Sequence, residues 1–242
     1  PLPWRLGGQA KSLISATLES FVQYMPKEFA RKPRSLKDVE RWKATEFRLF
    51  LLYTGPVVLM DNMSEELYKN FMLFSVAINL LANPSTCHHF CDYANELLVC
   101  FVQHLSDIFG REQLVYNVHC LIHLAQDVKK HGPLDQFSSF PFENFLHSLK
   151  KLVRKPNFPL EQVILRLKEQ AHSDCSKPIN QHLTTLRKQH HSGPLPRGNL
   201  YSEYAQYKEA ILEEFTISTH RGDNCVKIGD NVCLIRNILH SE

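Results

Sequence analysis

Glu143 is the acidic residue whose surroundings best suit chemistry, and it lies in residues 138–144, SSFPFEN. Pro141 predicts that a helix begins here, because proline is tolerated best in the first turn of a helix. Glu143 then falls in the same first turn, where the helix dipole stabilises a carboxylate. Two interpretations stay open: an ordinary helix-start acid, or a metal ligand held on a rigid element. Two-metal phosphoryl transfer needs several converging carboxylates, so Glu143 alone does not form such a site.

Two histidines and a cysteine form the next group with chemical potential, in residues 119–123, HCLIH. The apolar pattern predicts a helix over about 114–130, which places His119 and His123 one turn apart on one face. This is the spacing of the H-E-x-x-H zinc hydrolases, but Cys120 occupies the position of their general-base glutamate. Cys120 and His123 also form a C-x-x-H pair, and two ligands are fewer than a zinc site requires. The sequence predicts either a packed helix with hydrogen-bonded histidines or part of a shared zinc site.

The seven cysteines favour free thiols over a disulfide framework. Their number is odd, and the first four lie within apolar helical patterns, which fits a reducing compartment. Cys87 and Cys91 are about one helical turn apart. Because cysteine is among the most buried residues, we expect both to be core thiols. The alternative is a zinc site that they share with His119, Cys120 or His123.

Basic residues are concentrated in two stretches, although the net charge is only +3. Residues 27–48 hold eight Lys and Arg against four acids, and residues 150–188 hold nine against three. Such stretches are either solvated helix faces or contacts for nucleic-acid phosphates. The cluster that follows Glu143 by about two to three helical turns comprises Lys150, Lys151, Arg154 and Lys155.

The chain as a whole is predicted to be mainly α-helical. Its 242 residues and 43% apolar content allow one large domain or two small ones. Apolar residues recur at helical spacing, which predicts helices over about 10–25, 35–53, 64–83, 85–109, 114–130 and 141–155, and a last one around 163–167. Gly55 and Pro56 are expected to end the second of these helices. No run of eighteen apolar residues exists, so we expect no membrane-spanning helix.

The composition changes after Ala171, where the sequence becomes polar and is broken by Pro and Gly. Residues 201–214 fit a short helix, and two β-rich runs on either side of Gly229 predict a hairpin. Because a lone hairpin is marginal in water, we expect the chain to stop inside a small β module. The predicted organisation is a helical region at 1–115, returning helices at 116–172, a polar linker at 173–200, and a short helix with a truncated β-hairpin at 201–242.

Several short motifs give the segment from Leu36 to Glu169 a resemblance to the transposases of the CACTA (En/Spm-like) group. The motifs begin with residues 42–48 (WKATEFR) and 51–53 (LLY). They continue with Asn117-Val118-His119, Leu121, His123-Leu124, Gly132-Pro133-Leu134 and residues 139–144 (SFPFEN). Each motif is short, and their order and spacing carry the resemblance.

The resemblance implies a DDE-type enzyme with an RNase H-like core, in which a helical insertion separates the second catalytic Asp from the final Glu. Residues 1–115 correspond to that insertion. A C-x-x-H motif lies shortly before the final Glu in this group, and Cys120 and His123 match it. Glu143 matches the final acid, whereas the first two acids would lie upstream of Pro1. The resemblance therefore implies a C-terminal fragment that is inactive alone.

The implied activity is metal-assisted cleavage and transfer of DNA strands in the nucleus. Paired Mg²⁺ or Mn²⁺ ions would activate water or a 3′-hydroxyl, and Glu143 would help to hold one ion. The four cations from Lys150 to Lys155 would bind DNA phosphates without reading sequence, and homo-oligomers are a further expectation. Two alternatives stay open: a domesticated non-catalytic module that binds DNA or protein, and a zinc-stabilised helical domain of unrelated function.

Overall fold

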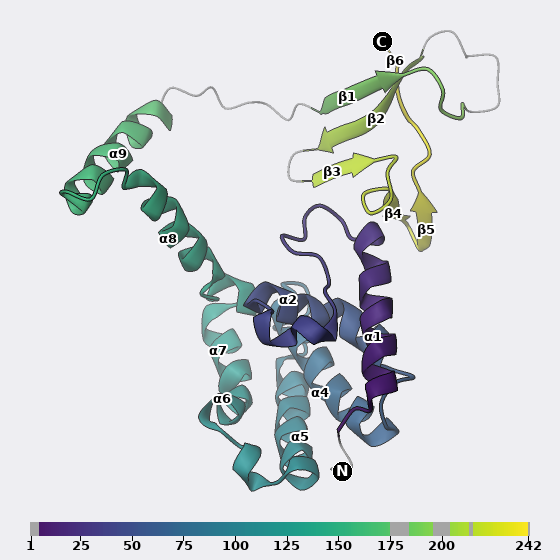
Figure 1. Cartoon of the computed structure of the whole chain (residues 1–242), viewed down its shortest axis with the longest axis vertical. Helices are drawn as coiled ribbons and strands as arrows, with labels where there is room; N and C mark the ends of the chain where they lie inside the picture. Colours follow the sequence, from purple (N-terminus) through teal and green to yellow (C-terminus); the bar gives the residue numbers. More distant parts are fainter. Residues whose placement is uncertain (1–4, 175–183, 196–203, 213–214, 242) are drawn as a thin grey trace. The chain divides into compact units, whose positions relative to one another are not determined.

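The computed structural model describes residues 5–174, 184–195, 204–212 and 215–241 (Figure 1). The chain divides into two compact units. The first comprises Pro1–Val76, His104–Gln113 and His182–Glu242, and the second comprises Ala77–Gln103 and Leu114–Gln181. The prediction of a mainly helical chain with a small C-terminal β element is confirmed. None of the described helices is long and apolar enough to cross a membrane.

The first unit begins with helical elements that share one apolar core. They are α1 (Gly8–Phe21), η1 (Val22–Tyr24), η2 (Leu36–Arg41), α2 (Ala44–Leu49), the π-helical η3 (Phe50–Thr54), α3 (Gly55–Leu59) and the first part of α4 (Glu65–Ala82). Ile14 and Leu18 lie one turn apart on α1 and pack with Trp42, Val58 and Leu59. The Trp42 indole N–H donates to the carbonyl of Ser35 at 3.3 Å, so its polar group is paired inside this core.

The chain stays helical through Gly55 and Pro56, so the prediction that this pair ends the helix is wrong. The Gly55 N–H donates to the Phe50 carbonyl, five residues back, and Pro56 has no N–H to offer. The Leu51 carbonyl therefore lacks a donor from its own helix. The Ser75 hydroxyl on α4 donates to it instead, at 2.7 Å. A side chain 24 residues away thus completes the π-turn.

The helical chain breaks earlier than expected, between η2 and α2, where Trp42 adopts an extended conformation. Glu46 holds this junction together and is only 4% exposed. Its carboxylate accepts hydrogen bonds from the Lys43 N–H at 2.8 Å and from Arg34 Nη2 at 3.0 Å. The same Arg34 nitrogen donates to the Arg41 carbonyl at 2.8 Å. An ion pair between half-buried Arg34 and buried Glu46 therefore fixes the turn that the sequence did not predict.

The ion pair of Glu46 gives a pH-dependent contribution to stability. Burial acts to raise the pKa of Glu46, but hydrogen bonds from Arg34 and the Lys43 N–H, with the charge of Arg34, lower it overall. Because the folded-state pKa lies below the ordinary value of 4.5, the pair stabilises the fold above that pH. This contribution is lost as the pH falls through the folded-state pKa.

We expect Glu46→Gln to lower the free energy of unfolding by about 2 kcal/mol at pH 7. The difference from the wild type should shrink as the pH is lowered to about 3, because protonation weakens the same pair in the wild type. Urea titrations at the two pH values measure this difference. Glu65→Gln is the control, because Glu65 pairs with Lys69 on the exposed surface of α4. An equal difference at both pH values would contradict the assignment.

The described strands of the first unit are β1 (Thr185–His190), β2 (Tyr204–Leu212), β3 (Phe215–Ser218), β4 (Cys225–Ile228), β5 (Asn231–Leu234) and β6 (Ile238–Ser241) (Figure 1). β1 pairs antiparallel along β2, whereas β3 pairs with the C-terminal half of β2 and β6 with its N-terminal half. β4 and β5 form a separate hairpin, as predicted. Its two-residue turn contains Gly229 at φ 61°, a conformation that glycine adopts readily.

The segment 204–212 forms a strand, so the prediction of a short helix at 201–214 is wrong over the described residues. Its sequence, YAQYKEAIL, contains Ala, Glu and Lys, which favour helices locally. Pairing with three other strands overrides that preference, because strand formation depends mainly on neighbours. The linker predicted at 173–200 likewise contains β1. The rest of that prediction falls largely on 175–183 and 196–203, which lie outside the described residues.

Lys27 joins the β part of the first unit to the segment that follows α1. Its Nζ lies 3.0 Å from Glu209 Oε1 and 3.1 Å from Asp223 Oδ2, and its N–H donates to Asp223 Oδ1 at 2.9 Å. Lys188 Nζ lies 3.2 Å from Glu209 Oε2. Hydrogen bonds from Lys27 and Lys188 lower the pKa of Glu209. Because Glu209 and Asp223 are both buried, their charges depend on these lysines.

The second unit is helical in its described residues. It contains most of α5 (Cys91–Phe109), then α6 (Tyr116–His119), η5 (Cys120–His123), α7 (Leu124–His131), η6 (Leu134–Gln136), α8 (Phe140–Leu152) and α9 (Pro159–Asp174). Cys87 and Cys91 are fully buried, which confirms the prediction of core thiols. The Cys91 thiol donates to the Ala125 carbonyl at 3.1 Å, and burial raises the pKa of this thiol.

Candidate nucleic-acid interface

Glu143 lies in the first turn of α8, as predicted from Pro141. Its N–H donates to the Ser139 carbonyl at 3.0 Å, and its side chain is exposed. Among the described residues, no group of three or more His, Cys, Asp or Glu side chains is placed to hold a metal ion. Within this part of the chain, Glu143 is therefore a single carboxylate without converging acids.

The basic cluster begins on α8 and continues beyond its end. Lys150 and Lys151 occupy the last turn of α8, where the helix dipole favours cations. The helix was expected to reach about Lys155, but it ends at Leu152. Pro156 explains why the helix does not reach Lys155, because the residue before a proline is pushed away from helical geometry. Arg154 and Lys155 therefore lie in the connection to α9.

We call residues 153–158 the α8–α9 loop, and Gln162 on α9 fixes its backbone. The Gln162 side-chain oxygen accepts from the N–H groups of Arg154 at 3.0 Å and Lys155 at 3.2 Å. Its side-chain nitrogen donates to the carbonyls of Lys155 at 2.9 Å and Asn157 at 2.6 Å. Four hydrogen bonds from one side chain hold the loop in a defined shape. The role of Gln162 was not predicted from the sequence. The only indication there is its position, in the first turn after a loop that contains Pro156 and ends at Pro159.

The cations of residues 27–48 differ from the cluster between Lys150 and Lys155 in whether they have partners within the chain. In residues 27–48, Lys27 pairs with buried carboxylates, Lys32 donates to backbone carbonyls and Arg34 pairs with Glu46. By contrast, the cluster on α8 and the α8–α9 loop forms no ion pair with any acid in the described part of the chain. Its members are all exposed, namely Lys150, Lys151, Arg154 and Lys155. These cations are available to an anionic partner.

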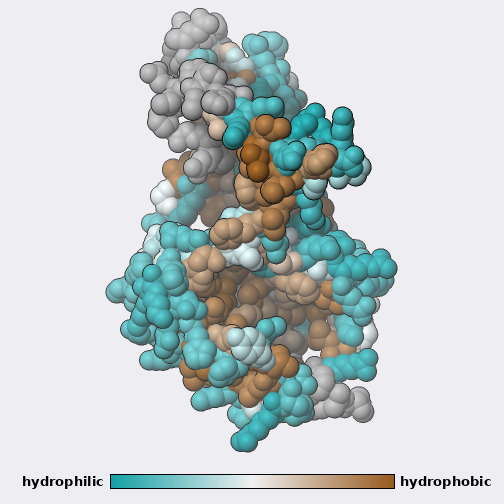
Figure 2. All heavy atoms as spheres, turned by 90° about the vertical axis from the view of Figure 1, so that its left-hand side faces the viewer, coloured by the Kyte–Doolittle hydropathy of each residue, from teal (hydrophilic) through white to brown (hydrophobic). Residues whose placement is uncertain are grey.

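Exposed apolar side chains accompany this cluster. Figure 2 shows hydrophobic side chains among hydrophilic ones on the face that it presents. Phe142 and Phe145 on α8 are 69% and 55% exposed, and Phe158 in the α8–α9 loop is 68% exposed. Exposed aromatic rings and unpaired cations thus occur on the same helix and loop. Surfaces that bind single-stranded nucleic acids combine both, because rings stack on bases and cations neutralise phosphates.

The His119, Cys120 and His123 group lies on α6 and η5, so the expected single helix is interrupted by a 3-10 turn. The two imidazoles share a face, with ring centroids 5.3 Å apart, as their spacing predicted. Both histidines are exposed, and Cys120 is half-buried. A hydrogen bond with Cys120 raises the pKa of Tyr116. The described residues bring no third ligand to this pair, so they do not assemble a zinc site here.

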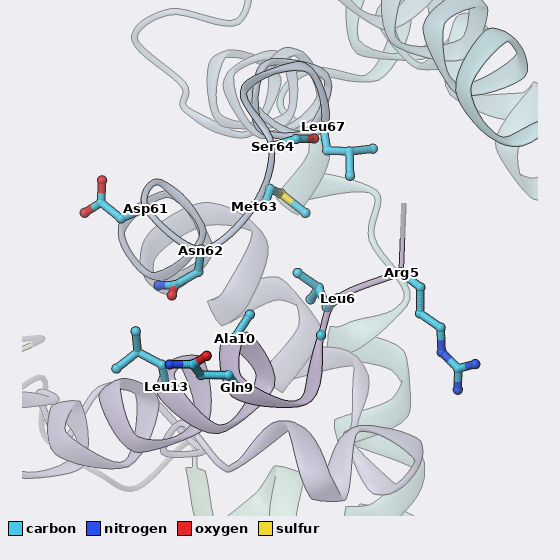
Figure 3. Close-up of a pocket in the computed structure, with 11 residues that line it drawn as sticks. Arg5, Leu6, Gln9, Ala10, Leu13, Asp61, Asn62, Met63, Ser64 and Leu67 are labelled. Atoms are coloured by element: carbon cyan, nitrogen blue, oxygen red, sulfur yellow. The ribbon is translucent and has the colours of Figure 1, made fainter. Parts of the chain in front are cut away.

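A pocket of about 460 Å³ lies in the first unit (Figure 3). None of the residues that line it was predicted from the sequence to be a site residue. Its wall includes the apolar side chains of Leu6, Met63 and Leu67. In Figure 3 the charged groups of Arg5 and Asp61 point away from each other and from the hollow. The uncharged polar residues of its lining are Gln9, Asn62 and Ser64.

The comparisons with known proteins give one family match. Residues 86–192 match the family model described as "Domain of unknown function (DUF4218)". This domain occurs in transposase-like proteins of plants, and the match gives no specific support for the CACTA group. No curated protein and no solved structure matches the chain. The matched residues include Glu143, the C-x-x-H pair and the whole basic cluster, so every site residue predicted from the sequence falls within a domain seen in transposase-like proteins.

Proposed function

We propose that this chain is the C-terminal part of a DDE-type DNA transposase of the CACTA group and that it binds DNA phosphates through the basic cluster of α8 and the α8–α9 loop. The observation that carries the proposal is the set of four exposed cations, unpaired within the described residues, on a helix end and a loop fixed by Gln162. The match of residues 86–192 to a domain that occurs in plant transposase-like proteins supports the transposase part of this proposal.

In this proposal the chain provides DNA contact and one catalytic acid. Each cation that meets a phosphate releases a condensed counterion, so affinity depends on salt and little on base sequence. Glu143 stands on the same helix and would supply one carboxylate to a Mg²⁺ or Mn²⁺ pair. The other acids would come from an RNase H-like core of the full-length protein. The site of action would be the nucleus, and the active form a homo-oligomer that pairs two DNA ends.

The proposal is tested by charge reversal in the α8–α9 loop. The double substitution Arg154→Glu with Lys155→Glu should weaken binding to duplex DNA of random sequence by roughly tenfold or more at 0.1 M salt. It should also reduce the slope of log affinity against log salt concentration by about one for each phosphate that the variant no longer binds. Fluorescence anisotropy at several salt concentrations gives both quantities.

The matched control is Lys11→Glu with Lys227→Glu, which changes the net charge equally at two exposed positions outside the cluster. Those positions lie on α1 and β4. If both double variants weaken binding equally, only the net charge matters and the proposed interface is wrong. If the wild-type chain does not bind DNA, the proposed DNA-binding function fails.

A non-catalytic DNA-binding module is the second candidate, and the isolation of Glu143 among the described residues favours it. It predicts the same loss of DNA binding on charge reversal. The two candidates differ in whether the full-length protein cleaves DNA with the help of the Glu143 carboxylate. That question is addressed by a substitution in the full-length protein, which is described in the Discussion.

A further inference from the structure

Phe158 is the residue of the α8–α9 loop whose conformation least suits its side chain. Its φ is 53°, in the left-handed region that a bulky residue rarely adopts. Its ring is 68% exposed, and no aromatic contact is found for it among the described residues. Both features disfavour this arrangement, because a left-handed backbone strains a non-glycine residue and exposure leaves an apolar ring in water.

The arrangement persists because neighbouring groups hold the loop. Gln162 donates to the Asn157 carbonyl, directly before Phe158, and its own N–H donates to the Phe158 carbonyl at 3.1 Å. Pro159 follows at once and opens α9. These contacts fix the backbone on both sides of the ring. The phenyl group is thus presented to solvent on a rigid support, three residues beyond Lys155.

We propose that Phe158 stacks on an unpaired DNA base while Arg154 and Lys155 neutralise the phosphates that flank it. This inference rests on the proposed DNA-binding function and specifies its partner as single-stranded DNA. A phenyl ring has no hydrogen-bonding group with which to read the edges of paired bases. It does have a face that stacks on any base that is free of its partner. Stacking of this kind is tolerant of sequence, as is phosphate binding by the neighbouring cations.

We infer single-stranded DNA and not duplex DNA because the faces of the bases are accessible only in a single strand. In duplex DNA the base faces are covered by their neighbours, so a ring fixed on the protein surface finds only groove edges and backbone. In an unpaired strand the faces are free. A ring fixed in advance loses little conformational entropy on binding, which favours affinity. On this proposal Arg154 and Lys155 bind the phosphates of single-stranded and duplex DNA alike, whereas Phe158 stacks only on the bases of a single strand.

The experiment compares binding of a labelled thymidine 20-mer and a duplex of equal length to variants at position 158. Phe158→Ala should weaken binding to the single strand by about tenfold and change duplex binding by less than about twofold. Phe158→Trp should keep or increase single-strand affinity, because it retains an aromatic face. Phe158→Leu should resemble the alanine variant, because it retains apolar bulk without that face.

Phe158→Gly separates binding from folding. Glycine adopts a φ of 53° without strain, so this variant should be at least as stable as the alanine variant and yet bind the single strand as weakly. Thermal unfolding measures the first property and anisotropy measures the second.

Three outcomes would overturn the inference. Wild-type affinity in Phe158→Ala would exclude stacking. Equal weakening on both DNA forms would indicate that the ring contacts duplex DNA. Wild-type affinity in Phe158→Leu would indicate a purely apolar contact. In each case the proposed function still stands if charge reversal of Arg154 and Lys155 weakens duplex binding by roughly tenfold or more and the control charge reversal does not. Failure of the wild type to bind either DNA form would remove both.

Discussion

Replacing Gly55 with alanine is expected to destabilise the first unit by about 3 kcal/mol, a large effect for a single methyl group. A Cβ at this position would lie 2.5 Å from the Phe50 carbonyl oxygen and 2.7 Å from Phe71 Cζ. The carbonyl cannot move aside, because it accepts the Gly55 N–H in the π-turn. The added methyl group must therefore distort the turn between α2 and α3.

The measurement is urea unfolding followed by the fluorescence of Trp42, whose ring lies 5.5 Å from that of Phe50. Gly8→Ala provides the control, because Gly8 is also helical and a Cβ there would meet nothing within 4 Å. That variant should be stabilised by about 0.5–1 kcal/mol, since alanine favours helix over glycine. If the Gly55→Ala protein is as stable as the wild type, the π-turn accommodates a Cβ at this position and the predicted clash is wrong.

If the proposed transposase function is correct, substitution of Glu143 by glutamine should reduce DNA cleavage by the full-length protein at least about 100-fold. Changes around metal ligands typically reduce activity roughly 10- to 100-fold, so the loss of a ligand itself should have a larger effect. Glutamine matches glutamate in size, and the side chain is exposed, so the fold should change in stability by less than about 1 kcal/mol. A plasmid cleavage assay with Mg²⁺ and with Mn²⁺ measures the effect.

Glu161→Gln is the matched control for this experiment. Glu161 is an exposed acid in the first turn of α9, as Glu143 is in α8, so both substitutions remove one charge from the start of a helix. Only the Glu143 variant should lose cleavage. If it cleaves as well as the wild type, Glu143 is not a metal ligand. If the wild-type protein itself does not cleave DNA, the basic cluster belongs to a non-catalytic DNA-binding module.

The sequence predicted features that depend on local pattern. Pro141 placed Glu143 in a first turn, the spacing of His119 and His123 placed both rings on one face, and the apolar context of Cys87 and Cys91 indicated buried thiols. Each of these features involves residues close together in the chain. Periodicity, proline position and burial preference suffice for such predictions because their physical causes are local.

The features that the sequence missed depend on residues far apart in the chain. Gly55 and Pro56 predicted the end of a helix. The helix continues because the Ser75 hydroxyl donates a hydrogen bond to the Leu51 carbonyl, which has no donor within the helix. The strand β2 read as a helix because its partners were not known. The shape of the α8–α9 loop depends on one amide, Gln162, whose role no periodic pattern indicates. The basic cluster was predicted by composition, but its freedom from ion pairs within the described residues is a property of the fold.

The ion pairs between Lys27 and the carboxylates of Glu209 and Asp223 have a consequence for synthesis of the protein. The first unit is assembled from three separate stretches of chain, and the second unit is encoded between them. During translation the second unit can complete its contacts once Gln181 has left the ribosome. The first unit must wait with Lys27 unpaired until β2 and the segment around Asp223 emerge. A chain whose synthesis ends before these partners emerge would therefore keep an unfinished first unit, which quality-control proteases would recognise.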